Sequence, residues 1–317
     1  MAASVDFELD RGHSALLVLL DGRAKLADVE RQILLDVEQL SRSLADAGYL
    51  ADRPLATALA LAVRLRRALL LEGEAGVGKT EAARALATAL GADLIRLQCY
   101  EGIDLHAAVY DWDYPKQLLA IRRAEAAHAP AGDLYDRSFL IRRPLLAALE
   151  APAPGAVLLI DEIDRADDEF EAFLLEYLQD FAITIPELGR VSAGRPPIVI
   201  LTSNRTRDLH DALKRRCFYH WIEHPALERE IEILRARLPA LSETLAREIA
   251  AFVTALRRLD LRKTPGIAEA LDLAEVIGAL GAGRLDRATL EAALGAVLKY
   301  PEDVAAVRAR LDQLLAA

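Results

Sequence analysis

The chain has 317 residues, of which 53% are hydrophobic and 28% are charged, and its formal net charge is −10. This length and composition predict a folded globular protein with more than one domain and exclude a disordered chain. The negative charge argues against nonspecific nucleic-acid binding, which depends on cationic side chains that release counterions from phosphates, although it does not exclude a local basic patch.

The sequence carries no sign of export, membrane insertion or a metal cluster. The opening residues MAASVDFELDR have acids where a secretory signal needs positive charge, and the apolar run from Ala15 to Leu20 is too short to span a bilayer. Cys99 and Cys217 lie far apart without Cys-x-x-Cys spacing, and the histidines show no metal-ligand spacing. We therefore expect a cytoplasmic protein with two buried free thiols.

The predicted elements fall into three zones. Residues 1–52 begin with a stretch to which we assign no structure (1–27) and continue as a helix with apolar residues at Val29, Ile33, Val37, Leu40 and Leu44. Residues 53–223 alternate helices with short apolar runs, and the expected strands are 68–72, 93–98, 156–160, 197–203 and 217–222. Continuous apolar strands separated by helices predict a parallel sheet covered on both faces. Residues 224–317 lack strand signals and predict an all-α domain, as the helical spacing of Leu245, Ile249 and Phe252 illustrates.

The stretch LEGEAGVGKTEAARAL (71–86) contains Gly-x-x-x-x-Gly-Lys-Thr between a predicted strand and a predicted helix. That context is typical of a P-loop, whose glycines turn backbone amides toward a phosphate chain and whose helix adds its positive dipole end. Lys79 is expected to reach the β- and γ-phosphates, and the Thr80 hydroxyl to bind Mg²⁺. The predicted nucleotide-binding residues here are Gly73, Glu74, Ala75, Gly76, Val77, Gly78, Lys79, Thr80 and Glu81.

A pair of acids follows another predicted strand in AVLLIDEIDRA. Asp161 and Glu162 would lie at the carboxyl end of that strand, in the crevice where open α/β sheets bind ligands. Asp161 is predicted to bind Mg²⁺, and Glu162 to orient and deprotonate the attacking water.

Two further polar positions are candidate site residues, and each also has a simpler structural explanation. Asn204 ends the predicted strand PIVILTS and either senses the water or γ-phosphate or caps the following turn. Arg215 and Arg216 end a short helix and either complement its dipole or act as an arginine finger in a neighbouring subunit's site.

The strings LEGEAGVGKT, LLIDEIDRA and TSNRTRDLHDALKRRC with the helical tail resemble an AAA+ ATPase of the MoxR group over roughly residues 45–290. More narrowly, RLQCYEGIDLHAAVYDWDYPKQLL, FLIRRPLL and ITIPELG resemble the branch associated with maturation of molybdenum–copper carbon monoxide dehydrogenase. The resemblance implies a five-stranded αβα core, a helical lid and a ring, usually a hexamer, with ATP at subunit interfaces. It also implies a chaperone-like role beside a protein with a von Willebrand factor A domain.

Carried over by resemblance, Asn204 is the first sensor and Arg216, which directly precedes a hydrophobic strand, is the favoured finger with Arg215 as the fallback. The lid departs from the pattern. Many relatives have Ser-Pro-Arg-Ala where this chain reads KTPGIAEA, so the second sensing arginine is missing and either Lys263 or Arg262 replaces it or the lid does not contact the γ-phosphate.

Two aromatic groups have different expected roles. The helical stripe containing Phe170, Phe173, Leu174, Tyr177, Leu178 and Phe181 is expected to be core. The segment AITIPELGRVSA predicts a β-hairpin. Tyr110, Trp112 and Tyr114 are candidate contacts to a client protein, with packing against the adjacent helix as the alternative.

Together these features predict a Mg²⁺-dependent ATPase that remodels a protein client, and the resemblance to the maturation branch implies that this client is a molybdenum hydroxylase such as carbon monoxide dehydrogenase. Guanine specificity is disfavoured because no Asn-Lys-x-Asp string occurs. The alternatives are a nucleic-acid-remodelling motor and an ATP-gated scaffold that assembles without cycling.

Overall fold

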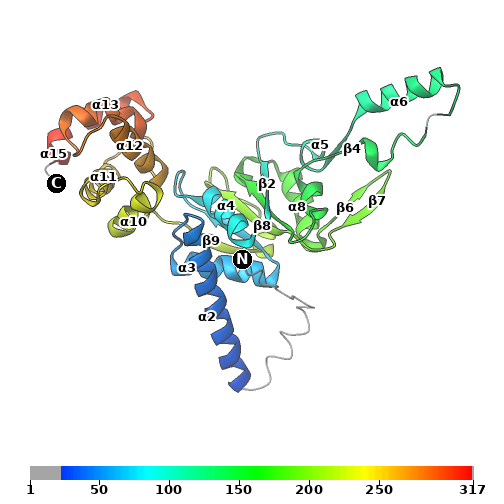
Figure 1. Ribbon diagram of the computed structural model, residues 1–317, viewed down its shortest axis with the longest axis horizontal. Coiled ribbons are helices and arrows are strands. Elements are labelled where there is room, and N and C mark those ends of the chain that lie inside the picture. Colours follow the sequence, from blue (N-terminus) through cyan, green and yellow to red (C-terminus); the bar gives the residue numbers. More distant parts are fainter. Residues whose placement is uncertain (1–22, 131, 316–317) are drawn as a thin grey trace.

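The computed structural model describes residues 23–130 and 132–315, and its centre is a five-stranded parallel sheet (Figure 1). The strand order is β2-β5-β8-β1-β9. The strands are β1 (Ala68–Glu72), β2 (Asp93–Gln98), β5 (Ala156–Asp161), β8 (Ile198–Ser203) and β9 (Cys217–Trp221). All five strands predicted from the sequence are confirmed, with ends that differ by one residue at most.

Helices cover both faces of this sheet. Alternate residues of each strand enter different cores: Leu70 and Leu158 face one core, whereas Leu69 and Val157 face the other. The second core includes residues of α2 (Arg23–Asp46), α3 (Arg53–Leu65) and α4 (Lys79–Leu90). The first includes residues of α5 (Leu105–Ala108), α7 (Pro144–Leu149), α8 (Asp168–Asp180) and α9 (Asp211–Arg216). The αβα core predicted from the sequence is therefore confirmed.

The helix predicted near the N-terminus is α2, which packs through Val37, Leu40 and Leu44. The side chains of Val29 and Ile33, and residues 1–22, lie outside the part of the chain that the structure describes.

The structure also contains two small antiparallel pairs of strands outside the five-stranded sheet. The predicted hairpin is confirmed as β6 (Ala182–Ile185) and β7 (Gly189–Ser192). The other pair, β3 (Tyr110–Trp112) and β4 (Leu140–Arg142), flanks an arm that contains α6 (Tyr114–Ala126) and the 3₁₀ turn η1 (Arg137–Phe139). Figure 1 shows α6 projecting away from the sheet.

The aromatic residues of the arm do not share one environment. Trp112 is 5% exposed and packs in the core, with its ring edge-on to Tyr135, so the packing alternative holds there and a client contact at Trp112 is wrong. Tyr110 is half-buried against the same core, whereas Tyr114 is 62% exposed. The stripe on α8 is core as expected: Phe170, Leu174, Tyr177 and Leu178 are buried, and Phe173 and Phe181 pack against them.

The C-terminal helices form a third core of their own beside the sheet (Figure 1). They are α10 (Leu227–Arg237), α11 (Glu243–Leu256), α12 (Ile267–Ala279), α13 (Arg287–Val297), α14 (Pro301–Arg308) and α15 (Leu311–Leu315). We call this group the lid. Among the described residues, no helix is both long and apolar enough to cross a membrane. Cys99 and Cys217 are buried free thiols, as expected, and burial raises the pKa of each to about 12.

Candidate functional site

The loop between β1 and α4 has the backbone conformation that its glycines permit. Gly76 and Gly78 have φ values of 81° and 95°, in the left-handed region that side chains other than glycine rarely adopt. A β-carbon on Gly73 would lie 2.5 Å from the carbonyl oxygen of Ile222, so this position has no room for a side chain. Helix α4 begins at Lys79, which brings its amino-terminal N–H groups to the loop, as an anion site requires.

Lys79 lies over this loop and is largely buried. Its Nζ donates hydrogen bonds to the carbonyl oxygens of Gly73 and Glu74, both at 2.7 Å. Burial lowers the pKa of the Lys79 ammonium, and the charges of Asp164, Asp161 and Glu162 oppose that shift. The ammonium therefore contacts the phosphate loop directly, and the acids at the end of β5 favour its charged form.

Asp161 is buried at the carboxyl end of β5 and is surrounded by three side chains. The Thr80 hydroxyl lies 3.1 Å from its Oδ1, and the Thr202 hydroxyl donates to Oδ1 at 2.5 Å. Arg96 of β2 donates to Oδ2 through Nε at 2.9 Å and Nη2 at 2.6 Å. Thr80, at the start of α4, and Asp161, at the end of β5, are thus brought together although they lie far apart in the sequence.

Glu162 follows directly and has a left-handed backbone, with φ at 55°. Its backbone N–H donates to the Thr202 hydroxyl at 2.9 Å, and its Oε2 accepts from Gln98 at 3.1 Å. A left-handed non-glycine residue persists only where its surroundings fix it. The carboxylate is half-buried and reaches the cleft described below.

Asn204 follows β8 on the same edge of the sheet. Its backbone N–H donates to Asp164 Oδ2 at 3.2 Å, and the same oxygen accepts from the Thr206 N–H at 2.8 Å and the Thr206 hydroxyl at 2.7 Å. Asp164 therefore fixes the turn that brings Asn204 to the cleft.

These residues share one cleft of about 880 Å³. Its polar lining includes residues 75–81, Asp161, Glu162, Thr202 and Asn204, whereas Gly73 and Glu74 do not line it; its other walls include Tyr49, Leu50, Ile222, Ile233 and Leu271. A site with one end rich in amides and charges and an adjoining apolar wall fits a ligand with a phosphate chain and a flat apolar part.

The lid contacts the phosphate loop through two glycines. The Ala268 N–H donates to the Gly76 carbonyl at 3.2 Å. A β-carbon on Gly266 would lie 2.7 Å from that carbonyl oxygen, so the backbones touch.

Neither proposed substitute for the second sensing arginine is free in the cleft. Lys263 pairs with Glu269 at 2.8 Å, and Arg262 lies over the Tyr300 ring, 4.3 Å from its centroid. The lid does bring another cation to the cleft, because Arg237 lines it and pairs with Glu81 at 2.8 Å.

Arg215 and Arg216 lie away from this chain's own cleft. They end α9 directly before β9, and Cys217 at the start of β9 pairs with Ala68 at the start of β1. The phosphate loop follows the other end of β1, and a five-residue strand spans roughly 17 Å. The Arg216 side chain donates hydrogen bonds to the Ala212 carbonyl and to the Gln179 side chain. The Arg67 side chain donates to the backbone carbonyls of Arg215 and Arg216.

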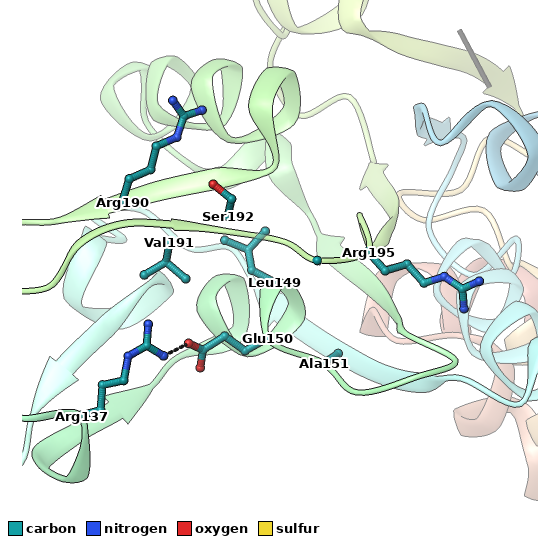
Figure 2. A pocket seen from close by; sticks show the side chains of 9 residues that line it. Arg137, Leu149, Glu150, Ala151, Arg190, Val191, Ser192 and Arg195 are labelled. Carbon is teal, nitrogen blue, oxygen red and sulfur yellow. Dashed lines mark hydrogen bonds and ion pairs between the residues drawn. The ribbon is translucent and has the colours of Figure 1, made fainter. Parts of the chain in front are cut away.

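A second cavity, of about 510 Å³, lies beside β7 and contains none of the predicted site residues. Figure 2 shows Arg137 turned toward Glu150, with which it forms a 2.6 Å ion pair, whereas Arg190 and Arg195 point in different directions. The arginines do not converge on one point, and we assign no site there.

The structure also reveals site residues that we did not predict: Arg96, Gln98, Asp164 and Thr202. Arg96 and Gln98 alternate with apolar residues in β2, and two polar residues near the end of a predicted parallel strand were a usable signal. Thr202 carries no such signal, because a threonine within an apolar strand run is ordinary.

The oxygen atoms around Asp161 fit a magnesium ion. The hydroxyls of Thr80 and Thr202 each lie within hydrogen-bond distance of the Asp161 carboxylate. Mg²⁺ prefers hard oxygen donors and is commonly held by one or two carboxylates together with substrate phosphates.

Comparison with known proteins agrees with this geometry. Residues 68–217 match the family model described as an AAA domain of the dynein-related subfamily. The chaperone protein ClpB 2 of Thermosynechococcus vestitus is 33% identical over 196 residues, which cover 57% of this chain and 19% of that protein. The negative regulator of genetic competence ClpC/MecB of Bacillus subtilis is 29% identical over 195 residues, which cover 57% of this chain and 21% of that protein. The matches thus span about a fifth of each relative.

Among solved structures, the RuvB Holliday junction branch migration motor of Thermotoga maritima is similar over 76% of this chain and 67% of its own, with 19% identity and a TM-score of 0.43. The family match and the cleft lead to the same conclusion: the chain carries an AAA+ ATPase domain.

Proposed function

We propose that this chain is a Mg²⁺-dependent ATPase motor that remodels a protein client. The observation that carries the proposal is the meeting of Lys79, Thr80, Asp161 and Glu162 at one end of one cleft. The loop amides and Lys79 would hold the phosphates, and the apolar wall with Tyr49 and Ile222 would pack against the base.

Thr80 and Asp161 would hold Mg²⁺, which when bound neutralises charge on the phosphates. Glu162 would orient the attacking water and accept its proton, and Asn204 would hydrogen-bond the water or the γ-phosphate. Gln98 keeps the Glu162 carboxylate at a defined position for that role.

We also propose that Arg216 completes the site of a neighbouring copy, with Arg215 as the fallback. Six cations gather at the amino edge of the sheet: Arg66, Arg67, Arg195, Lys214, Arg215 and Arg216. Within the described part of the chain, none of the six forms an ion pair with a carboxylate. Burial lowers the pKa of Arg66, and the positive charge of Arg195 lowers it further.

The opposite edge of the sheet is acidic, with Glu72, Asp161, Glu162 and Asp164. A head-to-tail assembly would bring the cationic edge of one copy to the acidic cleft of the next, and such heterologous contacts form a ring when the rotation between copies closes. This complementarity supports a ring, for which we propose a hexamer.

Mixing two inactive variants tests the shared site. Arg216→Ala alone should lose about 10³-fold or more in turnover. A mixture with Lys79→Ala should regain activity, since hybrid interfaces combine an intact loop with an intact arginine. No recovery at any mixing ratio would contradict the shared site.

For the client we propose a molybdenum hydroxylase such as carbon monoxide dehydrogenase, with a von Willebrand factor A domain protein as a further partner, in the cytoplasm. The strings that resemble the maturation branch support this, and the similar ClpB 2 is itself named a chaperone. Co-purification with the tagged chain should return such a protein. Turnover stimulated by DNA would contradict a protein client, and bound ATP without phosphate release would indicate a non-cycling scaffold.

A further inference from the structure

Asp161, the acid assigned to magnesium, already has a cationic partner. Arg96 contacts its Oδ2 through two nitrogens, at 2.9 and 2.6 Å. The contact depends on the sheet order: β2 lies beside β5, and Gln98 is the register partner of Asp161. Arg96, two residues earlier on the same face of β2, therefore reaches along the strand to the carboxylate.

The pair is unequal in its access to water. The Asp161 side chain is 4% exposed, whereas that of Arg96 is 49% exposed. A buried carboxylate needs a compensating charge, and the hydroxyls of Thr80 and Thr202 are neutral. The Lys79 ammonium also attracts Asp161, but its Nζ donates to the Gly73 and Glu74 carbonyls, so the direct ion pair is made by Arg96. The guanidinium, in contrast, can leave the contact and remain solvated.

Arg96 also connects the two carboxylates of the site. Its Nη2 donates to Gln98 Oε1, and Gln98 Nε2 donates to Glu162 Oε2 at 3.1 Å. Because the same Nη2 contacts both Asp161 and Gln98, a movement of this nitrogen away from Asp161 also changes its contact with the side chain that holds Glu162.

We propose that Arg96 is a displaceable counter-ion for Asp161: it neutralises the buried carboxylate and gives up Oδ2 when a divalent cation binds there. The inference rests on the proposed magnesium role of Asp161. Because two cations compete for one oxygen, Arg96 weakens metal binding. Because Arg96 contacts Gln98, metal binding also alters the support of Glu162.

Metal affinity measured without turnover tests this directly. Mn²⁺, whose free form gives an EPR signal, is titrated into protein saturated with ADP. Arg96→Gln should lower the dissociation constant for Mn²⁺ by about tenfold. The matched control is Arg165→Gln, which removes an exposed cation 3.5 Å from Glu162 and leaves the Asp161 pair intact, and should change the constant by less than about twofold.

Thermal unfolding with the metal alone gives a second readout of the same variant. Without metal, Arg96→Gln should unfold at a lower temperature than the wild type, and added Mg²⁺ should raise its unfolding temperature by more than it raises that of the wild type. Equal Mn²⁺ constants for wild type and Arg96→Gln would overturn the inference.

A measurement on the wild type avoids any folding defect. Phenylglyoxal modifies accessible arginines, and mass spectrometry can quantify modification of Arg96 with ADP, in the presence and absence of Mg²⁺. Modification should be faster with Mg²⁺, and an unchanged or slower rate would overturn the inference. A wild type that binds no Mn²⁺ with nucleotide would instead contradict the proposed function itself.

Discussion

Gly266 of the lid and Gly76 of the phosphate loop pack backbone against backbone. A β-carbon on Gly266 would lie 2.7 Å from the Gly76 carbonyl carbon and oxygen, closer than real β-carbons approach other atoms. The position where relatives are expected to carry a sensing arginine therefore serves here as a direct contact between lid and loop.

Replacing Gly266 with alanine should disturb that contact. Gly266→Ala is expected to lower the free energy of unfolding by about 1–3 kcal/mol, as overpacking does, and to weaken nucleotide binding because the loop must shift. Urea denaturation and nucleotide titration measure the two effects.

Gly278 provides the control on the same helix. It lies in the last turn of α12, and a β-carbon added there would meet no atom within 4 Å apart from its chain neighbours and the backbone of its own helix. Gly278→Ala should therefore stabilise the protein by up to about 1 kcal/mol through helix propensity. Equal effects of the two substitutions would contradict the proposed contact.

A buried ion pair fixes the segment that carries Gly266. Arg257 donates to both oxygens of Glu230 at 2.7 Å and to the Pro265 carbonyl at 2.8 Å, and the Glu230 side chain is fully buried. Arg257→Ala should lower the free energy of unfolding by about 3–5 kcal/mol, because it leaves the buried Glu230 carboxylate without a compensating charge. Chemical denaturation measures the loss.

The double variant Arg257→Met with Glu230→Leu should recover much of that stability, since no uncompensated charge remains. Arg235→Ala, which breaks an exposed pair with Glu243 in the same lid, should cost less than about 1 kcal/mol. A similar loss for Arg235→Ala and Arg257→Ala would contradict the importance of burial.

Glu269 makes the stability of the lid depend on pH. Although burial opposes its ionisation, hydrogen bonds from Lys263 and the Gly266 N–H hold the pKa of Glu269 below its ordinary value of 4.5. A lowered carboxyl pKa contributes stability above the unfolded-state pKa, and that contribution is lost as the pH falls through the folded-state pKa.

Glu269→Gln should therefore lower the free energy of unfolding by about 1–3 kcal/mol at pH 7, the value of hydrogen bonds to a charged group. The difference in the free energy of unfolding between the variant and the wild type should become smaller below pH 4.5. Denaturation curves from pH 7 to pH 3 measure this difference. A difference that stays constant over that range would show that it does not come from ionised Glu269.

Local signals in the sequence were sufficient to predict the sheet and to select several residues that the structure brings to the candidate site. Most of the five strands are apolar runs. Asp161 and Glu162 follow the end of one strand, the loop that leads to Lys79 and Thr80 follows the end of another, and such ends share one edge of a parallel sheet. Such residues are recognisable without knowing which strands are neighbours.

Contacts between distant segments could not be predicted in this way. The pairing of Arg96 with Asp161 depends on β2 lying beside β5, and the contact of Gly266 with Gly76 depends on how the lid meets the loop. The burial of Trp112 could not be predicted for the same reason. A short aromatic-rich segment has the same sequence pattern whether its indole is exposed or, as here, packed in a core.

The central claim is that Glu162 activates water for hydrolysis of ATP held by Lys79 and Asp161, and a single measurement tests it. Purified Glu162→Gln is incubated with ATP and Mg²⁺, separated from free nucleotide, and its bound nucleotide is identified and quantified beside the wild type and Lys79→Ala. We predict that Glu162→Gln retains ATP unhydrolysed with turnover reduced by about 10²-fold or more, whereas Lys79→Ala retains none. Wild-type turnover by Glu162→Gln, or normal ATP retention by Lys79→Ala, would contradict the account.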